Sequence, residues 1–120
     1  MKHLIYIFIG GGLGSVLRFL LSSFTHKLWK INEFPLGTFL VNIIGCFLIG
    51  FFSSYFIKAD NPLKFFLIAG FCGGFTTFST FSLENYTLLQ NGDYFTLILY
   101  ILLSILLGLI AVFLGLEYGK

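Results

Sequence analysis

Charged residues are scarce in this sequence. Only 10% of its 120 residues are Asp, Glu, Lys or Arg, whereas 58% are hydrophobic, and the mean hydropathy is +0.97. Five acidic and seven basic side chains are too few to cover the surface of a water-soluble domain of this size. The composition therefore excludes an ordinary soluble fold and indicates a protein whose outer surface faces lipid.

The few charges and cysteines also exclude several kinds of site. The net charge of +2 comes from isolated basic residues rather than a basic stripe, which argues against nucleic-acid binding. Cys46 and Cys72 lie inside apolar segments without a CxxC or Cys/His spacing, so we interpret both as small packing residues. No set of nucleophile, base and metal ligands is recognisable, and we therefore expect no enzyme.

Long apolar runs make up most of the chain. Each is long enough to cross a hydrocarbon core as a helix, which takes about 20 residues, and far longer than the roughly 10 residues of a membrane β-strand. The first run follows Lys2 as a signal peptide would, but it continues to about Phe24 and reads as a retained span. The sequence therefore predicts an all-α membrane protein, one domain over residues 1–120, with four transmembrane helices at about 4–24, 36–57, 63–90 and 95–116.

The basic residues hardly favour one orientation in the membrane. An even number of spans places both termini on one side, and the bases then divide four to three: Lys2, Lys58, Lys64 and Lys120 against Arg18, Lys27 and Lys30. A difference of one is too small to fix the topology by the positive-inside rule. If both orientations form, the expected assembly is an antiparallel homodimer with its two-fold axis in the membrane plane.

Arg18 is the only base deep within an apolar run. A charge at a helix centre costs about 2.5 to 3.5 kcal/mol to insert, so its presence calls for a reason. Two interpretations stay open. The side chain either reaches the loop that follows the first span or draws anions toward a vestibule.

Glycines recur at four-residue spacing in the first and third runs. Gly10 and Gly14, like Gly70 and Gly74, match the small-xxx-small pattern that lets membrane helices approach closely. Residues 10–14 lack both the GxGxxG spacing and the lysine of a Walker loop, which excludes a nucleotide site. Helix packing is therefore the predicted role of these glycines.

The segment from Gly70 to Ser82 interrupts the third apolar run with glycines and hydroxyls and reads GFCGGFTTFSTFS. Such a sequence at mid-membrane predicts a broken helix, whose freed backbone groups need protein, water or an ion as partners. The freed carbonyls suit a cation, and the freed donors suit an anion. Phe78 and Phe81 would share one side of the helix that resumes after the break, although phenylalanines at this spacing are usually core or lipid-facing.

Polar side chains also recur at helical spacing in the second and fourth runs. Thr38 and Asn42 share a face of the second span. An amide in mid-membrane either bonds a neighbouring helix or donates its two N–H groups to a permeating anion, and both interpretations stay open. In the fourth span Tyr100, Ser104 and Gly108 form a narrow stripe of the kind that faces protein or water.

Three motifs, in their order and spacing, resemble those of the CrcB or Fluc fluoride channels, four-helix membrane proteins that export fluoride from microbial cells. They are GGGLGSVLRF from Gly10, PLGTFLVNIIGCFLIG from Pro35, and the GFCGGFTTFSTFS segment. The resemblance covers the whole chain, and the third motif is highly specific. It implies a dual-topology antiparallel homodimer in a prokaryotic cell membrane, with two fluoride pores that are each lined by both subunits.

The resemblance also assigns roles to residues. Phe78 and Phe81 correspond to paired phenylalanines whose electropositive ring edges contact fluoride, with Asn42 as the pore amide. The polar track beside the rings would comprise Thr38, Ser79, Thr80, Tyr100 and Ser104, with Glu84 near one end. The backbone carbonyls of Gly73 and Thr76 would hold a structural Na⁺ where the two subunits meet at the dimer axis.

The sequence departs from the common family pattern at four positions. These are Phe19, Phe39, Cys46 and Gly108, where Tyr, Leu, Ser and often Ser are expected. Gly108 is the departure with a functional consequence, because it removes a hydroxyl from the end of the polar track.

A proton-coupled exporter of the small multidrug type is the alternative, since it shares four short helices and dual topology. Such an exporter needs an acid in its first helix that exchanges protons and binds organic cations. Here the first run carries Arg18 and no acid, and Glu84 lies near a helix end, which favours the channel. A non-transporting assembly subunit would explain the glycine packing but not the cluster of hydroxyls and phenylalanines.

Overall fold

The computed structural model describes residues 2–28, 34–56 and 62–120. All secondary structure in these ranges is helical: α1 (Lys2–Leu28), α2 (Leu36–Tyr55), η1 (Phe65–Cys72), α3 (Gly73–Phe75), α4 (Phe78–Gln90) and α5 (Tyr94–Tyr118). Since η1, α3 and α4 follow one another as a single span, the described residues form four helical segments long and apolar enough to cross a membrane. The predicted all-α fold with four spans is confirmed.

The observed helix ends differ from the predicted ones by a few residues. The first span, predicted at 4–24, continues to Leu28, and the buried hydroxyl of Thr25 bonds back to the Leu21 carbonyl within it. The second, predicted at 36–57, ends as a helix at Tyr55. The fourth, predicted at 95–116, runs from Tyr94 to Tyr118. Asp93 caps its start by accepting the Thr96 amide. Apolar content locates a span well, but caps decide where it ends.

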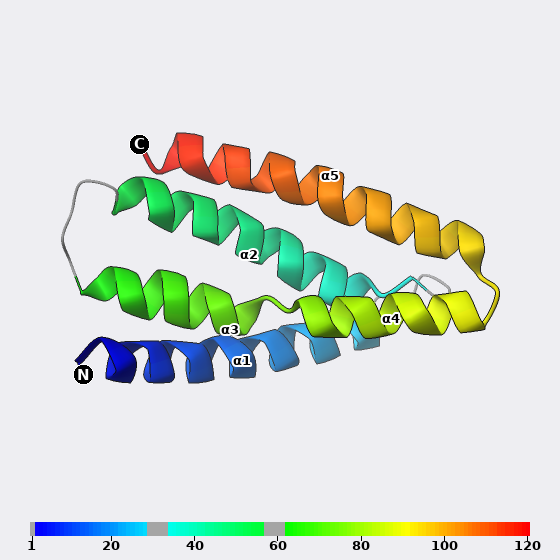
Figure 1. Ribbon diagram of the computed structural model, residues 1–120, viewed down its shortest axis with the longest axis horizontal. Helices are drawn as coiled ribbons and strands as arrows, with labels where there is room; N and C mark the ends of the chain where they lie inside the picture. Colours follow the sequence, from blue (N-terminus) through cyan, green and yellow to red (C-terminus); the bar gives the residue numbers. More distant parts are fainter. Residues whose placement is uncertain (1, 29–33, 57–61) are drawn as a thin grey trace.

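The helices form an elongated bundle of 48 × 27 × 24 Å that contains two helix pairs. In one pair α2 packs along α5, and in the other α1 packs along η1 and α3 (Figure 1). Both termini lie at the same end of the bundle, as an even number of spans requires (Figure 1). At the opposite end a tight turn joins α4 to α5, and Gly92 adopts a φ of 75° there, which glycine tolerates best.

Glycine allows α1 and the third span to approach backbone to backbone. A Cβ on Gly14 would lie 2.9 Å from a backbone nitrogen of α3, and a Cβ on Gly70 would lie 2.9 Å from a carbonyl oxygen of α1. Gly10 and Gly74 face the opposite backbone at similarly close range. Their predicted role in helix packing is therefore confirmed.

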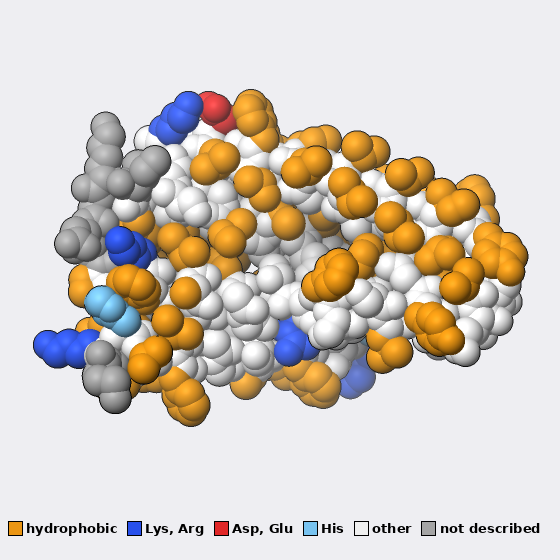
Figure 2. All heavy atoms as spheres, viewed as in Figure 1, with side chains coloured by type: hydrophobic (Ala, Val, Ile, Leu, Met, Phe, Trp, Pro, Cys, Tyr) orange, Lys and Arg blue, Asp and Glu red, His pale blue; other side chains and the backbone are white. Residues whose placement is uncertain are grey.

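The outer surface of the protein is strongly apolar. Large hydrophobic side chains cover it along its whole length, and the few charged ones in view include a group at the end that carries the termini (Figure 2). Phe8 on α1 and Phe95 on α5 are 82% and 77% exposed. In water such a surface would aggregate, whereas in a bilayer it contacts lipid chains.

The third span is broken at the place that the sequence predicted. Helix α3 ends at Phe75, Thr76 is extended with a ψ of 158°, and α4 begins at Phe78 with Thr77 as its N-cap. The eight residues of η1 before the break form a π-helix, which the sequence did not indicate. Long π-helices are rare and often accompany functional sites. Here the π-helix lies against the glycine face of α1.

Candidate functional site

Asn42 bridges α2 to the break in the third span. Its Oδ1 accepts the backbone N–H of Thr77 at 3.1 Å, and its Nδ2 donates to the Thr77 carbonyl oxygen at 3.4 Å. The amide thus satisfies both backbone groups of one residue at the break, as a neighbouring helix would do. The interhelical role of Asn42 is therefore present, and the second hydrogen of Nδ2 remains for another acceptor.

The break removes the regular α-helical donors of the carbonyls in residues 73–76. In a continuous α-helix the Thr77 amide would donate to Gly73, and the Thr80 amide to Thr76. Here the Thr77 amide donates to Asn42, and the Thr80 amide donates to the Thr77 hydroxyl at 3.3 Å. The carbonyls of Gly73 and Thr76, predicted as cation ligands, are thus among those whose helical donors have been redirected.

Arg18 donates a hydrogen bond to the carbonyl of Gly74, which lies between Gly73 and Thr76 in the chain. Its Nε donates to the Gly74 carbonyl oxygen at 3.1 Å, and the Ser15 hydroxyl approaches the same oxygen at 3.5 Å. This contact was in neither interpretation of Arg18, because it joins the side chain to the broken helix rather than to the loop. Arg18 is partly buried, so a positive charge lies beside the break.

A cavity of about 380 Å³ opens between α2, α4 and α5. Its lining includes four of the nine predicted pore residues, Asn42, Phe78, Phe81 and Ser104, together with Cys46, Cys72, Thr76 and Thr77. Apart from the Asn42 amide and three hydroxyls, the side chains of this wall are apolar or thiols. Few, well-placed polar groups in an apolar cleft are typical of a small-ligand site.

Phe78 and Phe81 face this cavity from the first turn of α4. Their ring centroids are 6.0 Å apart with an interplanar angle of 38°, and Phe81 also lies 4.9 Å from the ring of Tyr100. Phe78 is 78% exposed. The predicted pairing of the two rings on one side of the helix is therefore seen, with Phe81 partly buried against Tyr100 and Phe78 on the surface.

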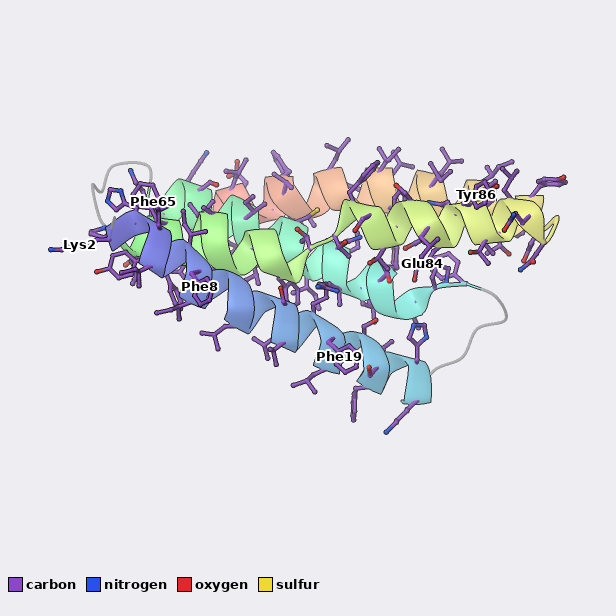
Figure 3. The ribbon with its side chains drawn as sticks, turned by 60° about the horizontal axis from the view of Figure 1, so that its bottom comes forward. Lys2, Phe8, Phe19, Phe65, Glu84 and Tyr86 are labelled. Carbon is purple, nitrogen blue, oxygen red and sulfur yellow. The ribbon has the colours of Figure 1, made fainter. Side chains whose placement is uncertain are left out.

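A second polar cluster lies closer to the α4–α5 turn. The carboxylate of Glu84 accepts the Thr38 hydroxyl at 2.8 Å and the Tyr100 hydroxyl at 2.9 Å. Glu84 points from α4 toward the start of α2, whereas Tyr86 points to the other side (Figure 3). Thr38 and Tyr100 are almost fully buried, so the cluster joins α2, α4 and α5 inside the bundle. Phe81, in contact with Tyr100, connects it to the cavity.

Ser79 and Thr80 adjoin the cavity through Thr77. Their hydroxyls bond the Thr77 hydroxyl at 3.0 and 3.4 Å, around the N-terminus of α4. Neither residue itself lines the cavity, so their place in the polar track that the resemblance implies stays a prediction. At the other end of the stripe on α5, a Cβ on Gly108 would lie 3.5 Å from the Cys46 sulfur, so two of the four positions that depart from the family pattern face each other.

The comparison with known proteins agrees with this geometry. The sequence profile described as CrcB-like protein, Camphor Resistance, matches residues 5–116 and thus all four spans. The chain belongs to the CrcB family. Similar CrcB relatives include three proteins named fluoride-specific ion channel FluC, one each from Azobacteroides pseudotrichonymphae, Flavobacterium psychrophilum and Bacteroides fragilis.

These CrcB relatives match the chain along nearly its whole length. The Azobacteroides protein is 50% identical over 96% of this chain and 94% of its own. The Flavobacterium protein is 52% identical and the Bacteroides fragilis protein 50%, each over 100% of this chain and 98% of its own. About 50% identity over nearly the full length of each chain indicates that these relatives share the four spans and their order.

Two residues of this CrcB chain were missed by the sequence reading. Thr77 caps α4, and part of the signal was available, since threonine is a preferred N-cap residue at the start of a helical run. Ser15 shares a face of α1 with Arg18, and both contact Gly74. Their three-residue spacing predicts that they lie on the same face of α1, but the sequence does not indicate which carbonyl they bind.

Proposed function

We propose that this chain is a channel that conducts fluoride selectively across the membrane. The observation that carries this proposal is the cavity where the Asn42 amide and the rings of Phe78 and Phe81 meet. Fluoride is small and strongly hydrated, so a pore must replace its water with several donors. The amide N–H, the hydroxyls and the electropositive ring edges are donors of that kind and leave no opposing charge in the cavity.

The proposed path runs from this cavity to the cluster of Thr38, Glu84 and Tyr100. Phe81 touches Tyr100, so the ring edges and the buried hydroxyls follow one another along α4. An anion that leaves the cavity toward the α4–α5 turn therefore reaches the Thr38 and Tyr100 hydroxyls, which here donate to Glu84. This order explains why polar residues of α2, α4 and α5 converge in an otherwise apolar bundle.

We further propose that two copies assemble antiparallel and form two pores. Phe78, on the wall of the cavity, is largely exposed, so the cavity of one protomer opens on its surface. A second copy would close this wall, and two-fold symmetry would then produce two equivalent cavities. The nearly even distribution of bases between the two ends favours insertion in both orientations.

A structural Na⁺ fits the carbonyls of Gly73 and Thr76. Both have lost their regular helical donors to Asn42 and Thr77, and oxygen atoms are the ligands that a hard cation prefers. Gly73 is exposed and has no neighbour within 4 Å of its Cβ direction, so a second copy has room to approach. The ion would join the two breaks at the dimer axis.

The cellular setting follows from the channel function. The apolar surface and four spans make this a multi-pass membrane protein, and we place it in the cell membrane of a prokaryote. There, passive conduction would let fluoride that has accumulated inside the cell leave it. The experiment that tests the function is efflux of fluoride from liposomes that contain the purified protein, with chloride efflux from the same preparation as the comparison.

The rings provide the sharpest variant for this assay. The Phe78→Ile, Phe81→Ile double variant keeps apolar volume but loses both ring edges, and we expect it to lose most fluoride efflux while remaining folded. Phe8→Ile is the matched control, because Phe8 is a surface phenylalanine of α1 far from the cavity. Wild-type efflux from the correctly assembled double variant would show that the rings only pack.

The antiparallel arrangement has its own test. Reporters fused to the C-terminus should give equal signals on the two faces of the membrane if the chain inserts both ways. A single orientation for nearly all molecules would contradict the antiparallel dimer without affecting the conduction assay.

A further inference from the structure

His26 lies where the last turn of α1 meets the first turn of α2. A Cβ built on Gly37 would lie 3.1 Å from its Nε2 and 2.7 Å from the hydroxyl of Ser22, so the imidazole reaches the space that glycine leaves open. The next residue, Thr38, donates its hydroxyl to Glu84. The imidazole is thus near enough for a charge on it to act on the Glu84 carboxylate.

The charged groups around this histidine are few. Glu84 approaches from α4 and Tyr100 from α5, Lys27 follows it on α1, and the described part of α2 offers no titratable side chain at this end. Among the residues that the structure describes, no lysine or arginine forms an ion pair with Glu84. A protonated His26 would therefore be the nearest described cation that can attract this carboxylate.

The present arrangement leaves an anion without these hydroxyl donors. A hydroxyl has one hydrogen to donate, and both Thr38 and Tyr100 donate theirs to Glu84. The carboxylate also repels an anion that comes near. If fluoride passes this cluster, the carboxylate must first release the two hydroxyls and lose part of its negative field.

We propose that His26 is a positioning residue whose protonation draws the Glu84 carboxylate away from Thr38 and Tyr100, so that their hydroxyls bond the passing anion. The inference rests on the proposed channel function. In acid the imidazole takes a proton from the surrounding water, and the resulting imidazolium partly neutralises the field of the carboxylate. At higher pH the neutral ring leaves Glu84 bonded to both hydroxyls. Fluoride efflux should therefore rise as the pH falls through the range in which histidine titrates.

The test is a pH profile of fluoride efflux from liposomes with equal pH on both sides. We expect wild-type efflux at a pH of about 5.5 to exceed that at about 8 by about fivefold, the lower end of typical coupling between linked sites. His26→Gln, which keeps hydrogen-bonding groups but cannot gain the charge, should give a flat profile. His26→Lys, charged throughout this range, should give a flat profile at the faster, acidic level.

His3→Gln is the matched control. His3 lies at the opposite end of α1, where its ring stacks on Phe65 at 4.1 Å, and this variant should keep the wild-type profile. Gel filtration would verify that each variant is assembled. An unchanged pH response in assembled His26→Gln, or its loss in His3→Gln, would overturn the inference and leave the channel function standing. Absence of wild-type fluoride efflux at every pH would instead overturn the channel function, and this inference with it.

Discussion

Compared with α4, the first half of the third span, η1 and α3, is held mainly by backbone contacts. Gly70 and Gly74 lie against the backbone of α1, and Gly10 and Gly14 complete the contact from the other side. Helix α4 approaches its neighbours through side chains instead, with Glu84 as an example, since it bonds hydroxyls from α2 and α5. The two halves belong to one span, but the first is held by backbone contacts and the second by side-chain contacts.

This difference suggests that η1 and α3 mainly stabilise the fold, whereas α4 supplies the side chains that contact the ion. A backbone contact leaves no side chain free to meet an ion, and it tolerates no enlargement. A side-chain contact can be exchanged for a contact with an ion, as the hydroxyls at Glu84 illustrate. The comparison therefore predicts that changes in η1 and α3, or in the α1 face against them, reduce stability, whereas changes in and around α4 reduce conduction.

The largest effect is expected for Asn42→Asp, which acts on the boundary between the two halves. The change replaces a donor by a negative charge beside the Thr77 carbonyl and in the anion path. Two like charges about 4 Å apart repel by about 4 kcal/mol near a protein surface, so fluoride efflux should fall at least about 100-fold. Gln90→Glu, the same change from an amide to a carboxylate at an exposed position near the end of α4, should leave efflux close to wild type. Similar rates for the two variants would remove Asn42 from the path.

A change in the supporting half should reduce stability. Gly14→Ala would place a methyl group against the backbone of α3, and overpacking of this kind costs about 1–3 kcal/mol. Gly12→Ala is the control on the same helix, because nothing lies within 4 Å of its Cβ direction. Thermal unfolding in detergent should show a lower midpoint for the first variant alone. Equal midpoints would mean that the close approach of the backbones contributes little.

Two phenylalanines, one from each half, test the comparison directly. Phe81→Ile removes a ring edge from the cavity and should slow fluoride efflux about tenfold, the upper range of an aromatic contribution. Phe71→Ile removes a ring that stacks on Phe75 in the supporting half and should leave efflux per assembled molecule unchanged. The measurement is fluoride efflux from equal amounts of each variant, taken from gel-filtration fractions that contain the assembled protein. A slower Phe71→Ile channel would show that the halves do not divide their roles.

The smallest effect is expected where α4 begins. Thr77→Ala removes the hydroxyl that accepts the Thr80 amide, and loss of an N-cap costs about 1 kcal/mol. The unfolding midpoint should fall slightly, and Thr77→Ser, which keeps the hydroxyl, should restore it. A drop that serine does not restore would assign the loss to the methyl group rather than to the cap.

Much of the fold could be predicted because lipid imposes simple rules on sequence. Apolar length located the four spans, and the glycines and hydroxyls from Gly70 to Ser82 located the break. The glycine faces could also be predicted, since a four-residue spacing on a helix fixes which residues lie together. The π-helix of η1 could not, because its apolar residues fit either helix type and only packing against α1 distinguishes them.

The sequence predicted which of several side chains lie together, but not the contacts that they make. Asn42, Phe78 and Phe81 do meet at one cavity, but the partner of the amide, the Thr77 backbone, depends on how α2 lies against the break. The contact of Arg18 with Gly74 depends likewise on the placement of α1. Single-sequence patterns describe one helix at a time, whereas these contacts arise between helices.

The π-helix has a consequence for how this chain tolerates insertions and deletions. One residue gained or lost in a regular α-helix rotates every later side chain by about 100°, which would turn the face that follows away from its partners. In η1 a deletion can instead be absorbed by tightening the backbone bonds from i→i+5 to i→i+4. Length variation among related genes is therefore easiest to accommodate in Phe65–Cys72, upstream of the break, where it leaves the register of α4 intact.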